Sequence, residues 1–259
     1  MTIPTPEIPR EVVIVPGTDV DAAWERYQPF EPLHFLQDIL NPMSSAELER
    51  VMEALAVRPG MRLLDIACGH GEMLLRFAQR YRVDAIGLDE SPWAIVRAAQ
   101  RGTQRRLVGT VRWWLGSGAE APRGPFDVVT CVGASWIWHG FAGTVAAVGS
   151  RVRPGGRVAV GDLRAREDVE GPPGILTRRD QIDVIEAAGL LPIGEFVAAD
   201  ASWTAYQQRI MANAEAYALA SPGDPLRDRR AMAAEWMDDH WRDRRRLVWS
   251  VWVAEKPRS

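Results

Sequence analysis

The stretch that decides the fold is Leu63-Leu64-Asp65-Ile66-Ala67-Cys68-Gly69-His70-Gly71-Glu72-Met73-Leu74. An apolar run ends in an aspartate, a turn of small residues follows, and a helical pattern then begins. Small residues leave the main chain uncovered, so a ligand can approach the backbone N–H groups of such a turn closely. The stretch therefore predicts a strand, a nucleoside-binding loop and a helix.

Composition limits the class of protein. The chain has 259 residues, of which 47% are hydrophobic and 25% charged, and its net charge is −3. These values are typical of a soluble α/β domain with an insertion, and they favour neither a nucleic-acid nor a membrane partner. The two cysteines, Cys68 and Cys131, are too few for a disulfide framework or a four-ligand zinc site. We expect a reduced, cytoplasmic protein without a signal peptide, a membrane span or a metal.

Strand patterns alternate with helical patterns along most of the chain. This alternation predicts a Rossmann-like, doubly wound, mostly parallel seven-stranded sheet with helices on both faces. Residues 11–15 are a further, short strand candidate before the first helix. The seven expected strands are residues 62–66, 84–88, 111–115, 126–132, 157–160, 191–197 and 247–254.

Two segments fall outside the simple alternation. Residues 1–43 are expected to form an N-terminal arm and flap in front of a domain of residues 44–259. Within that domain, residues 200–246 read as a helical insertion before the last strand. An insertion of this size in a compact domain usually has a function, and we expect a lid.

The loop itself limits the choice of nucleotide. A dinucleotide fingerprint needs a third glycine for close helix packing, and Leu74 occupies that place. A phosphate-binding loop needs a lysine, and none lies nearby. The loop therefore suits a ligand without phosphates. Asp89, at the end of the next strand, is placed to bind both hydroxyls of a ribose, and Asp65 to bind loop amides or, through water, an ammonium group.

Four blocks in order resemble the class I S-adenosylmethionine (SAM) dependent methyltransferases over about residues 44–200. Within that family, Cys131-Val132-Gly133-Ala134-Ser135-Trp136 and the late Trp-bearing insertion are similar to bacterial small-molecule-type members without an assigned substrate. The four blocks are Leu63–Gly71, Ile86-Gly87-Leu88-Asp89-Glu90-Ser91, Phe126-Asp127-Val128-Val129-Thr130-Cys131 and Arg153-Pro154-Gly155-Gly156-Arg157.

The resemblance implies SAM as cofactor, bound by the loop and by the ends of the following strands. Two positions depart from the family pattern. Ala67 replaces the usual first loop glycine. Ser117 stands where the family has an aspartate that points toward the adenine. The cofactor-binding residues that the resemblance implies are Asp65, Ala67, Cys68, Gly69, Gly71, Asp89, Glu90, Ser117, Gly118, Ala119, Cys131 and Gly133.

The acceptor side is expected near the end of the strand at 126–132. A neutral His139 there is our candidate general base, and the alternative is a histidine that caps a helix. Trp136, Trp203, Trp236 and, in the flap, His34 are candidates for binding the substrate. For the tryptophans, packing of amphipathic helices is the alternative. His70 is expected to point outward from the first helical turn.

The sequence thus predicts transfer of the SAM methyl group to a small-molecule nucleophile by in-line displacement, with O, N, S and C all open as the atom methylated. Gly133-Ala134-Ser135-Trp136 stands where base-modifying relatives carry Asn/Asp-Pro-Pro-aromatic, which argues against a nucleic-acid substrate. One alternative is a SAM-binding regulatory or structural protein without turnover. Another, disfavoured by Leu74, is an NAD(P)-dependent oxidoreductase. The chain is expected to act as a monomer or homodimer.

Overall fold

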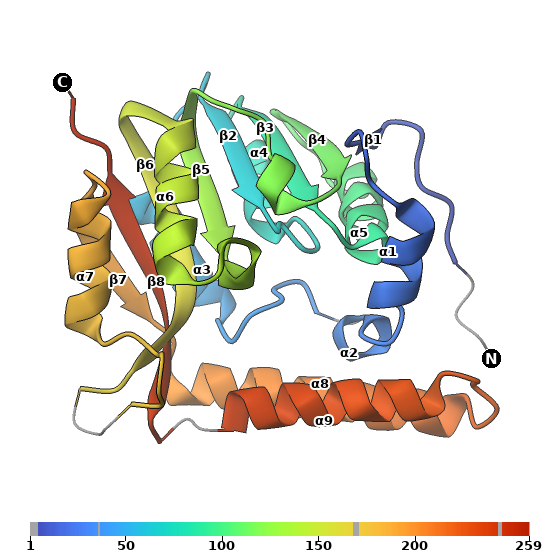
Figure 1. Ribbon diagram of the computed structural model, residues 1–259. Coiled ribbons are helices and arrows are strands. Elements are labelled where there is room, and N and C mark those ends of the chain that lie inside the picture. Colours follow the sequence, from blue (N-terminus) through green and yellow to red (C-terminus); the bar gives the residue numbers. More distant parts are fainter. Residues whose placement is uncertain (1–4, 36, 168–170, 243–244, 259) are drawn as a thin grey trace.

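The computed structural model describes residues 5–35, 37–167, 171–242 and 245–258, and the side chains of residues 236–242 are not part of that description. Its centre is an eight-stranded sheet in the order β1-β4-β3-β2-β5-β6-β8-β7 (Figure 1). The strands are β1 Val13–Ile14, β2 Arg62–Ile66, β3 Asp84–Asp89, β4 Thr110–Leu115, β5 Phe126–Val132, β6 Val152–Ala165, β7 Leu191–Val197 and β8 Leu247–Glu255.

The strands from β1 to β6 run parallel, and β8 is antiparallel to both β6 and β7. The predicted doubly wound, mostly parallel sheet is confirmed, with one strand more than the seven expected. The additional strand is β1, which pairs Val13 with Trp114 of β4 at the edge of the sheet. It is short because Pro16 and Gly17 turn the chain away after it.

Helices cover both faces of the sheet (Figure 1). Alternation along each strand divides the core into two clusters, so that Leu63 packs with one helical layer and Leu64 with the other. Burial on both faces explains why the central strands are almost continuously apolar. One layer holds α3 Ser45–Ala54, α4 Glu72–Arg80 and α5 Pro92–Thr103, and the other holds α6 Phe141–Arg151 and α7 Arg178–Ala187.

Local chemistry fixes where several of these helices begin. Ser44 and Glu47 form a reciprocal capping box at the start of α3. Ser91 caps α5 by accepting from the Ala94 amide, and Pro92 occupies the first turn, where it needs no N–H partner. These caps hold the helices that lead into and out of the loop after β2.

The chain adds β3 and β4 on one side of β2 and then returns to add β5 and β6 on its other side, so the strand order reverses between β2 and β5. In sheets of this kind, ligands bind outside the carboxyl ends of the strands at such a switch point. The loop after β2 and the residues after β5 therefore meet at the place where the fold offers a crevice.

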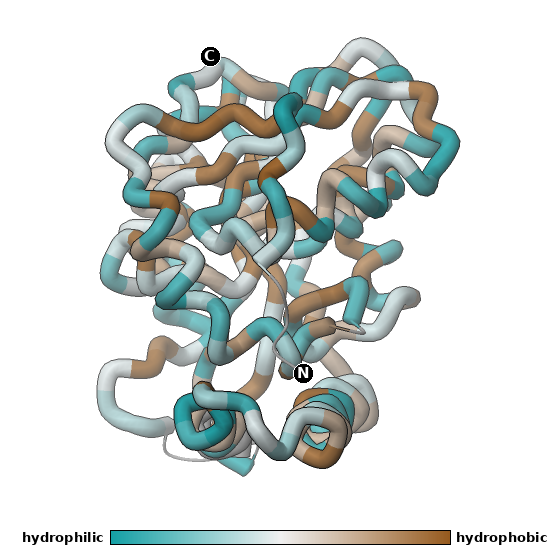
Figure 2. The backbone as a smooth tube through the Cα atoms, turned by 90° about the vertical axis from the view of Figure 1, so that its right-hand side faces the viewer, coloured by the Kyte–Doolittle hydropathy of each residue, from teal (hydrophilic) through white to brown (hydrophobic). Residues whose placement is uncertain are grey.

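Four helices lie at this end of the sheet. The N-terminal segment contains α1 Val20–Tyr27, which packs on α5 through an edge-to-face contact of Trp24 with Trp93, and α2 Glu31–His34. Between β7 and β8, the chain forms α8 Asp200–Ala220 and α9 Arg227–Arg242. Figure 1 shows α8 and α9 side by side across the carboxyl-end edge, and Figure 2 views the pair nearly end-on. Within the described residues, no helix has the length and apolar character to cross a membrane.

Candidate active site

The loop after β2 turns through three residues with left-handed backbone geometry: Ala67, Gly69 and Gly71, with φ of 57°, 53° and 71°. Glycine adopts this geometry freely, whereas a residue with a Cβ loses about 1 kcal/mol or more. Ala67 therefore holds a strained position. At Gly71, a Cβ would lie 2.3 Å from the Trp113 ring. Gly71 is required by packing against the sheet and does not line the cavity described below, so its role at the cofactor stays a prediction.

Two carboxyl groups, those of the buried Asp65 and the half-buried Asp89, lie beside this loop. Asp89 accepts hydrogen bonds from the Gly69 amide (2.8 Å) and the Ser91 amide (2.9 Å). Asp65 accepts from the Thr130 hydroxyl on the neighbouring β5 (2.6 Å), and its other carboxyl oxygen has no partner among the described residues. Burial raises the pKa of Asp65 to about 7 and that of Asp89 to about 6. A cation bound here would favour their ionised forms.

These groups open onto a cavity of about 470 Å³ whose lining is mostly apolar. That size suits a small molecule. Its walls come from the loop after β2, the end of β3, the residues after β5, the N-terminal segment and α8. We call the part lined by residues 26–43 and by Tyr206 of α8 the flap side of the cavity. From the N-terminal segment it includes Tyr27, Phe30, Glu31, His34, Ile39, Leu40, Asn41 and Met43.

The structure divides the residues expected at the cofactor into two groups. Ser117 does not line the cavity, because its hydroxyl caps a short 3₁₀ turn, η1 Gly118–Glu120, by accepting from the Ala119 amide. Ala119 is exposed and Cys131 is fully buried in the sheet, so neither reaches the cavity. Those that line it are Asp65, Ala67, Cys68, Gly69, Asp89, Glu90, Gly118 and Gly133.

The residues expected on the acceptor side also fall into those that line the cavity and those that do not. His34 and Trp136 line the cavity, and Trp136 is 68% exposed. His139 is an exposed residue that ends the 3₁₀ turn η2 Ser135–Trp138 and lies outside the cavity lining, so its role as general base stays a prediction. Trp203 of α8 is 2% exposed and packs in the core outside the cavity lining, so its role at the substrate stays a prediction. The side chain of Trp236 lies outside the described residues.

His70 is buried rather than outward-facing, which corrects the sequence interpretation. Its Nδ1 donates to the Gln37 carbonyl at 2.6 Å, and its own carbonyl accepts from Arg101 at 2.7 Å. Burial lowers the pKa of the imidazole to about 3, which keeps the ring neutral. No sequence signal joins His70 to Gln37, because the contact spans the flap and the loop.

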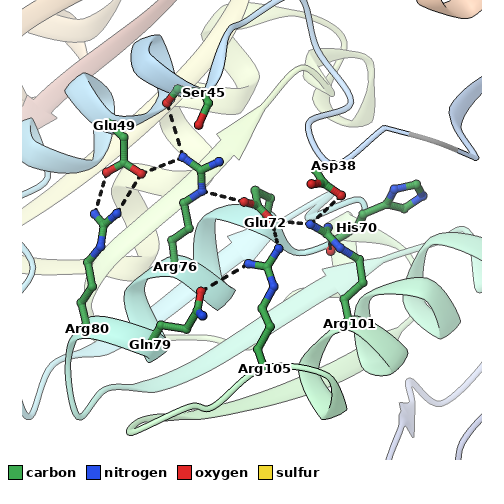
Figure 3. Close-up of polar contacts among 10 residues, drawn as sticks. All are labelled: Asp38, Ser45, Glu49, His70, Glu72, Arg76, Gln79, Arg80, Arg101 and Arg105. Atoms are coloured by element: carbon green, nitrogen blue, oxygen red, sulfur yellow. Dashed lines mark hydrogen bonds and ion pairs between the residues drawn. The ribbon is translucent and has the colours of Figure 1, made fainter.

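Figure 3 shows His70 beside a network of ion pairs that includes Arg101 and Glu72. Arg101 of α5 reaches Asp38 of the flap at 2.9 Å and also pairs with Glu72 of α4. Glu72 accepts from two further guanidinium groups, those of Arg76 (2.6 Å) and Arg105 (2.7 Å). Arg101 thus links the flap to the helix that follows the loop.

The fold and the loop together define an α/β protein with a cavity at its switch point. Residues 63–156 match the family described as "Methyltransferase domain". YjhP of Escherichia coli (strain K12), described as an uncharacterized protein, is 27% identical over 198 residues, covering 72% of this chain and 80% of that protein. Nocamycin O-methyltransferase of Saccharothrix syringae is 33% identical over 115 residues, covering 43% of this chain and 41% of that enzyme.

Among solved structures, a SAM-dependent methyltransferase from Geobacter sulfurreducens in complex with S-adenosyl-L-homocysteine superposes with a TM-score of 0.79. The two chains are 23% identical, and the superposition covers 88% of this chain and 98% of that one. The fold matches across nearly the whole of that protein. The chain therefore shares the fold of that protein, and residues 63–156 carry the sequence match to a methyltransferase domain.

Proposed function

We propose that this enzyme transfers the methyl group of SAM to a small, largely apolar molecule held on the flap side of the cavity. The observation that carries the proposal is one continuous cavity that joins the Asp65–Gly69 loop to an apolar flap side. Sites for small molecules are typically of this kind, concave and apolar with a few placed polar groups.

The residues present fit SAM. Asp65 offers a carboxyl oxygen that has no partner among the described residues. Each carboxyl oxygen of Asp89 accepts a hydrogen bond from a backbone amide and keeps a lone pair that can accept from a ribose hydroxyl. The wall requires a glycine at position 118, because a Cβ there would lie 2.8 Å from Ile137 and 2.9 Å from Ile66. Asp89 would hold the ribose, and Asp65 would face the positively charged end of the molecule.

When bound, SAM supplies a methyl group already activated on a sulfonium. The protein then has to hold the acceptor in line with the S–CH₃ bond and exclude water, and such positioning can contribute about 7–11 kcal/mol. Residues 1–43 and 200–246 act as the flap and the lid in this proposal. Two contacts support their roles: Leu40 lies over Gly69, and Tyr206 of α8 donates to the Leu40 carbonyl at 3.2 Å.

The cofactor half of the proposal is tested by calorimetric titration of SAM into wild type and Asp89→Asn. We expect the variant to bind about tenfold or more weakly, because a charge-assisted hydrogen bond to the ribose is lost. Asp183→Asn, an exposed carboxylate on α7 paired with Arg179, is the matched control and should bind like wild type. Equal affinity in wild type and Asp89→Asn would contradict the ribose assignment.

The transfer half is tested by supplying SAM and fractionated small-molecule extracts and measuring S-adenosylhomocysteine. Turnover that depends on one fraction supports the proposal. Tight SAM binding without turnover in any fraction would instead favour a regulatory SAM-binding protein. Titration with nicotinamide cofactors tests the oxidoreductase alternative, for which we expect no binding because Leu74 replaces the third glycine.

A further inference from the structure

The flap side of the cavity carries two polar side chains from a single turn of helix. Glu31 and His34 of α2 are three residues apart, which places them on the same face of that turn. Both line the cavity. Neither was needed to account for cofactor binding, so their chemistry bears on the acceptor.

Glu31 is a half-buried carboxyl group without a hydrogen bond or ion pair among the described residues. The two cations whose charges act on Glu31, Arg97 and Arg230, already have other contacts. Arg97 lies over the Phe35 ring at 5.2 Å, and Arg230 donates to Asp224 at 2.6 Å. Burial raises the pKa of Glu31 to about 7, and the charges of Arg97 and Arg230 oppose that rise.

The neighbouring polar groups are also acceptors. The Nδ1 of His34 lies 3.2 Å from the Phe30 carbonyl, and a carbonyl only accepts, so Nδ1 carries the hydrogen. Burial lowers the pKa of His34 to about 4, so the ring is neutral and Nε2 keeps a lone pair. The Oδ1 of Asn41 is buried and has no partner within the part of the chain that the structure describes, and Asn41 lines the same cavity.

The tyrosine hydroxyl donors on the flap side are already engaged. The Tyr27 hydroxyl donates to Glu90, and the Tyr206 hydroxyl donates to the Leu40 carbonyl. Arg26 is the one arginine or lysine in the described lining, and its side chain is exposed to solvent. The flap side therefore offers unpaired acceptors within apolar walls, and a ligand that brings its own donors would satisfy them.

We propose that the methyl acceptor is an apolar amine whose nitrogen donates hydrogen bonds to the carboxylate of Glu31 and to Nε2 of His34. This inference rests on the proposed function. In the transfer, the nitrogen lone pair forms the new N–CH₃ bond, and the S–CH₃ bond breaks with its electron pair remaining on sulfur. The nitrogen then gives one proton to the Glu31 carboxylate.

The experiment compares two probes of the same shape, phenethylamine and phenethyl alcohol. Each is titrated at about pH 8, where Glu31 is ionised, into protein saturated with S-adenosylhomocysteine. We expect wild type to bind the amine about tenfold or more tightly than the alcohol, because a charge-assisted hydrogen bond is made only with the amine. Glu31→Gln keeps the shape of the side chain and should bind both probes about equally.

The exposed Glu120 does not line the cavity, so Glu120→Gln is the matched control and should keep the preference for the amine. Affinity for S-adenosylhomocysteine should be unchanged in Glu31→Gln, which shows that the variant is folded and that cofactor binding stands separately. Equal binding of amine and alcohol by wild type, binding of neither, or a preference retained in Glu31→Gln would each overturn the assignment.

Discussion

Burial of the Asp65 carboxyl costs folding free energy, and the same carboxyl supplies an acceptor for the ligand. It ends an apolar strand, so its carboxyl is removed from water, and the one hydroxyl of Thr130 only partly offsets the loss of hydration. The strain at Ala67, two residues later, adds to that cost. Functional sites commonly hold such unfavourable features because the ligand uses them, and here the unpaired carboxyl oxygen is placed for a cation.

This cost predicts a dependence of stability on pH in the absence of ligand. Between the ordinary aspartate pKa of 3.8 and the folded value of about 7, the folded state binds more protons than the unfolded state. The free energy of unfolding therefore falls as pH rises through this window and stays level above it. Asp65→Asn lacks this contribution, and we expect it to be more stable than wild type by about 2 kcal/mol at about pH 8.

Urea denaturation at about pH 5 and about pH 8 measures the effect, with the exposed Asp183→Asn as control. The gain should be smaller at the lower pH, and the variant should lose affinity for SAM. A variant less stable than wild type at the higher pH would show that the buried carboxylate is favourable, contrary to this account.

At the scale of elements, the flap is tied to the cofactor loop by contacts that do not involve any ligand. Gln37 and Asp38 of the flap meet His70 and Arg101, and Arg101 in turn meets Glu72 (Figure 3). The arrangement makes the position of the flap depend on α4 and α5. The Arg101 guanidinium and the His70–Gln37 hydrogen bond therefore both tie the flap to the loop.

Arg101→Met should release this coupling. Breaking a buried ion pair is costly, but Glu72 keeps Arg76 and Arg105, so we expect a loss of stability of about 2 kcal/mol. Backbone hydrogen exchange in residues 37–43 should become faster than in wild type. Arg112→Met removes an exposed pair with Asp84 and should change neither measurement appreciably. Unchanged exchange in the flap of Arg101→Met would exclude the coupling.

At the scale of the whole molecule, α8 and α9 form a helical hairpin between β7 and β8 in the chain. The two strands still pair with each other. Val197 pairs with Ser250, and the Ala198 amide donates to the Trp249 carbonyl at 3.0 Å, so the two ends of the insertion lie close together. The hairpin also holds the N-terminal segment, because Asn213 donates to the Leu33 carbonyl at 3.0 Å.

Replacing residues 200–245 with a short Gly/Ser loop should therefore leave a folded sheet. Trp203, Tyr206 and Ile210 would no longer cover the core beside α3, so we expect a lower melting temperature. S-adenosylhomocysteine should still bind but should dissociate about tenfold faster, because the flap loses its cover. Stopped-flow measurement of release checks this, with Leu219→Ser on the exposed face of α8 as control. An unchanged release rate would show that the hairpin is not a lid.

The sequence by itself determined the elements and the class of ligand. The strand at 62–66 and the cap at Ser91 follow from local pattern and chemistry, and the residues of the loop exclude phosphate ligands whatever surrounds them. Even so, β6 runs over Val152–Ala165, well beyond the expected 157–160, because it extends as far as its partners β5 and β8 allow.

Only the tertiary structure decided which side chains share the cavity. Glu31 faces the site, Trp203 is buried in the core and His139 is left exposed, although local sequence did not distinguish these outcomes. The physical reason is that burial and hydrogen bonding depend on partners far away in the chain. Leu33 and Asn213, for example, meet across 180 residues, and no local pattern records that contact.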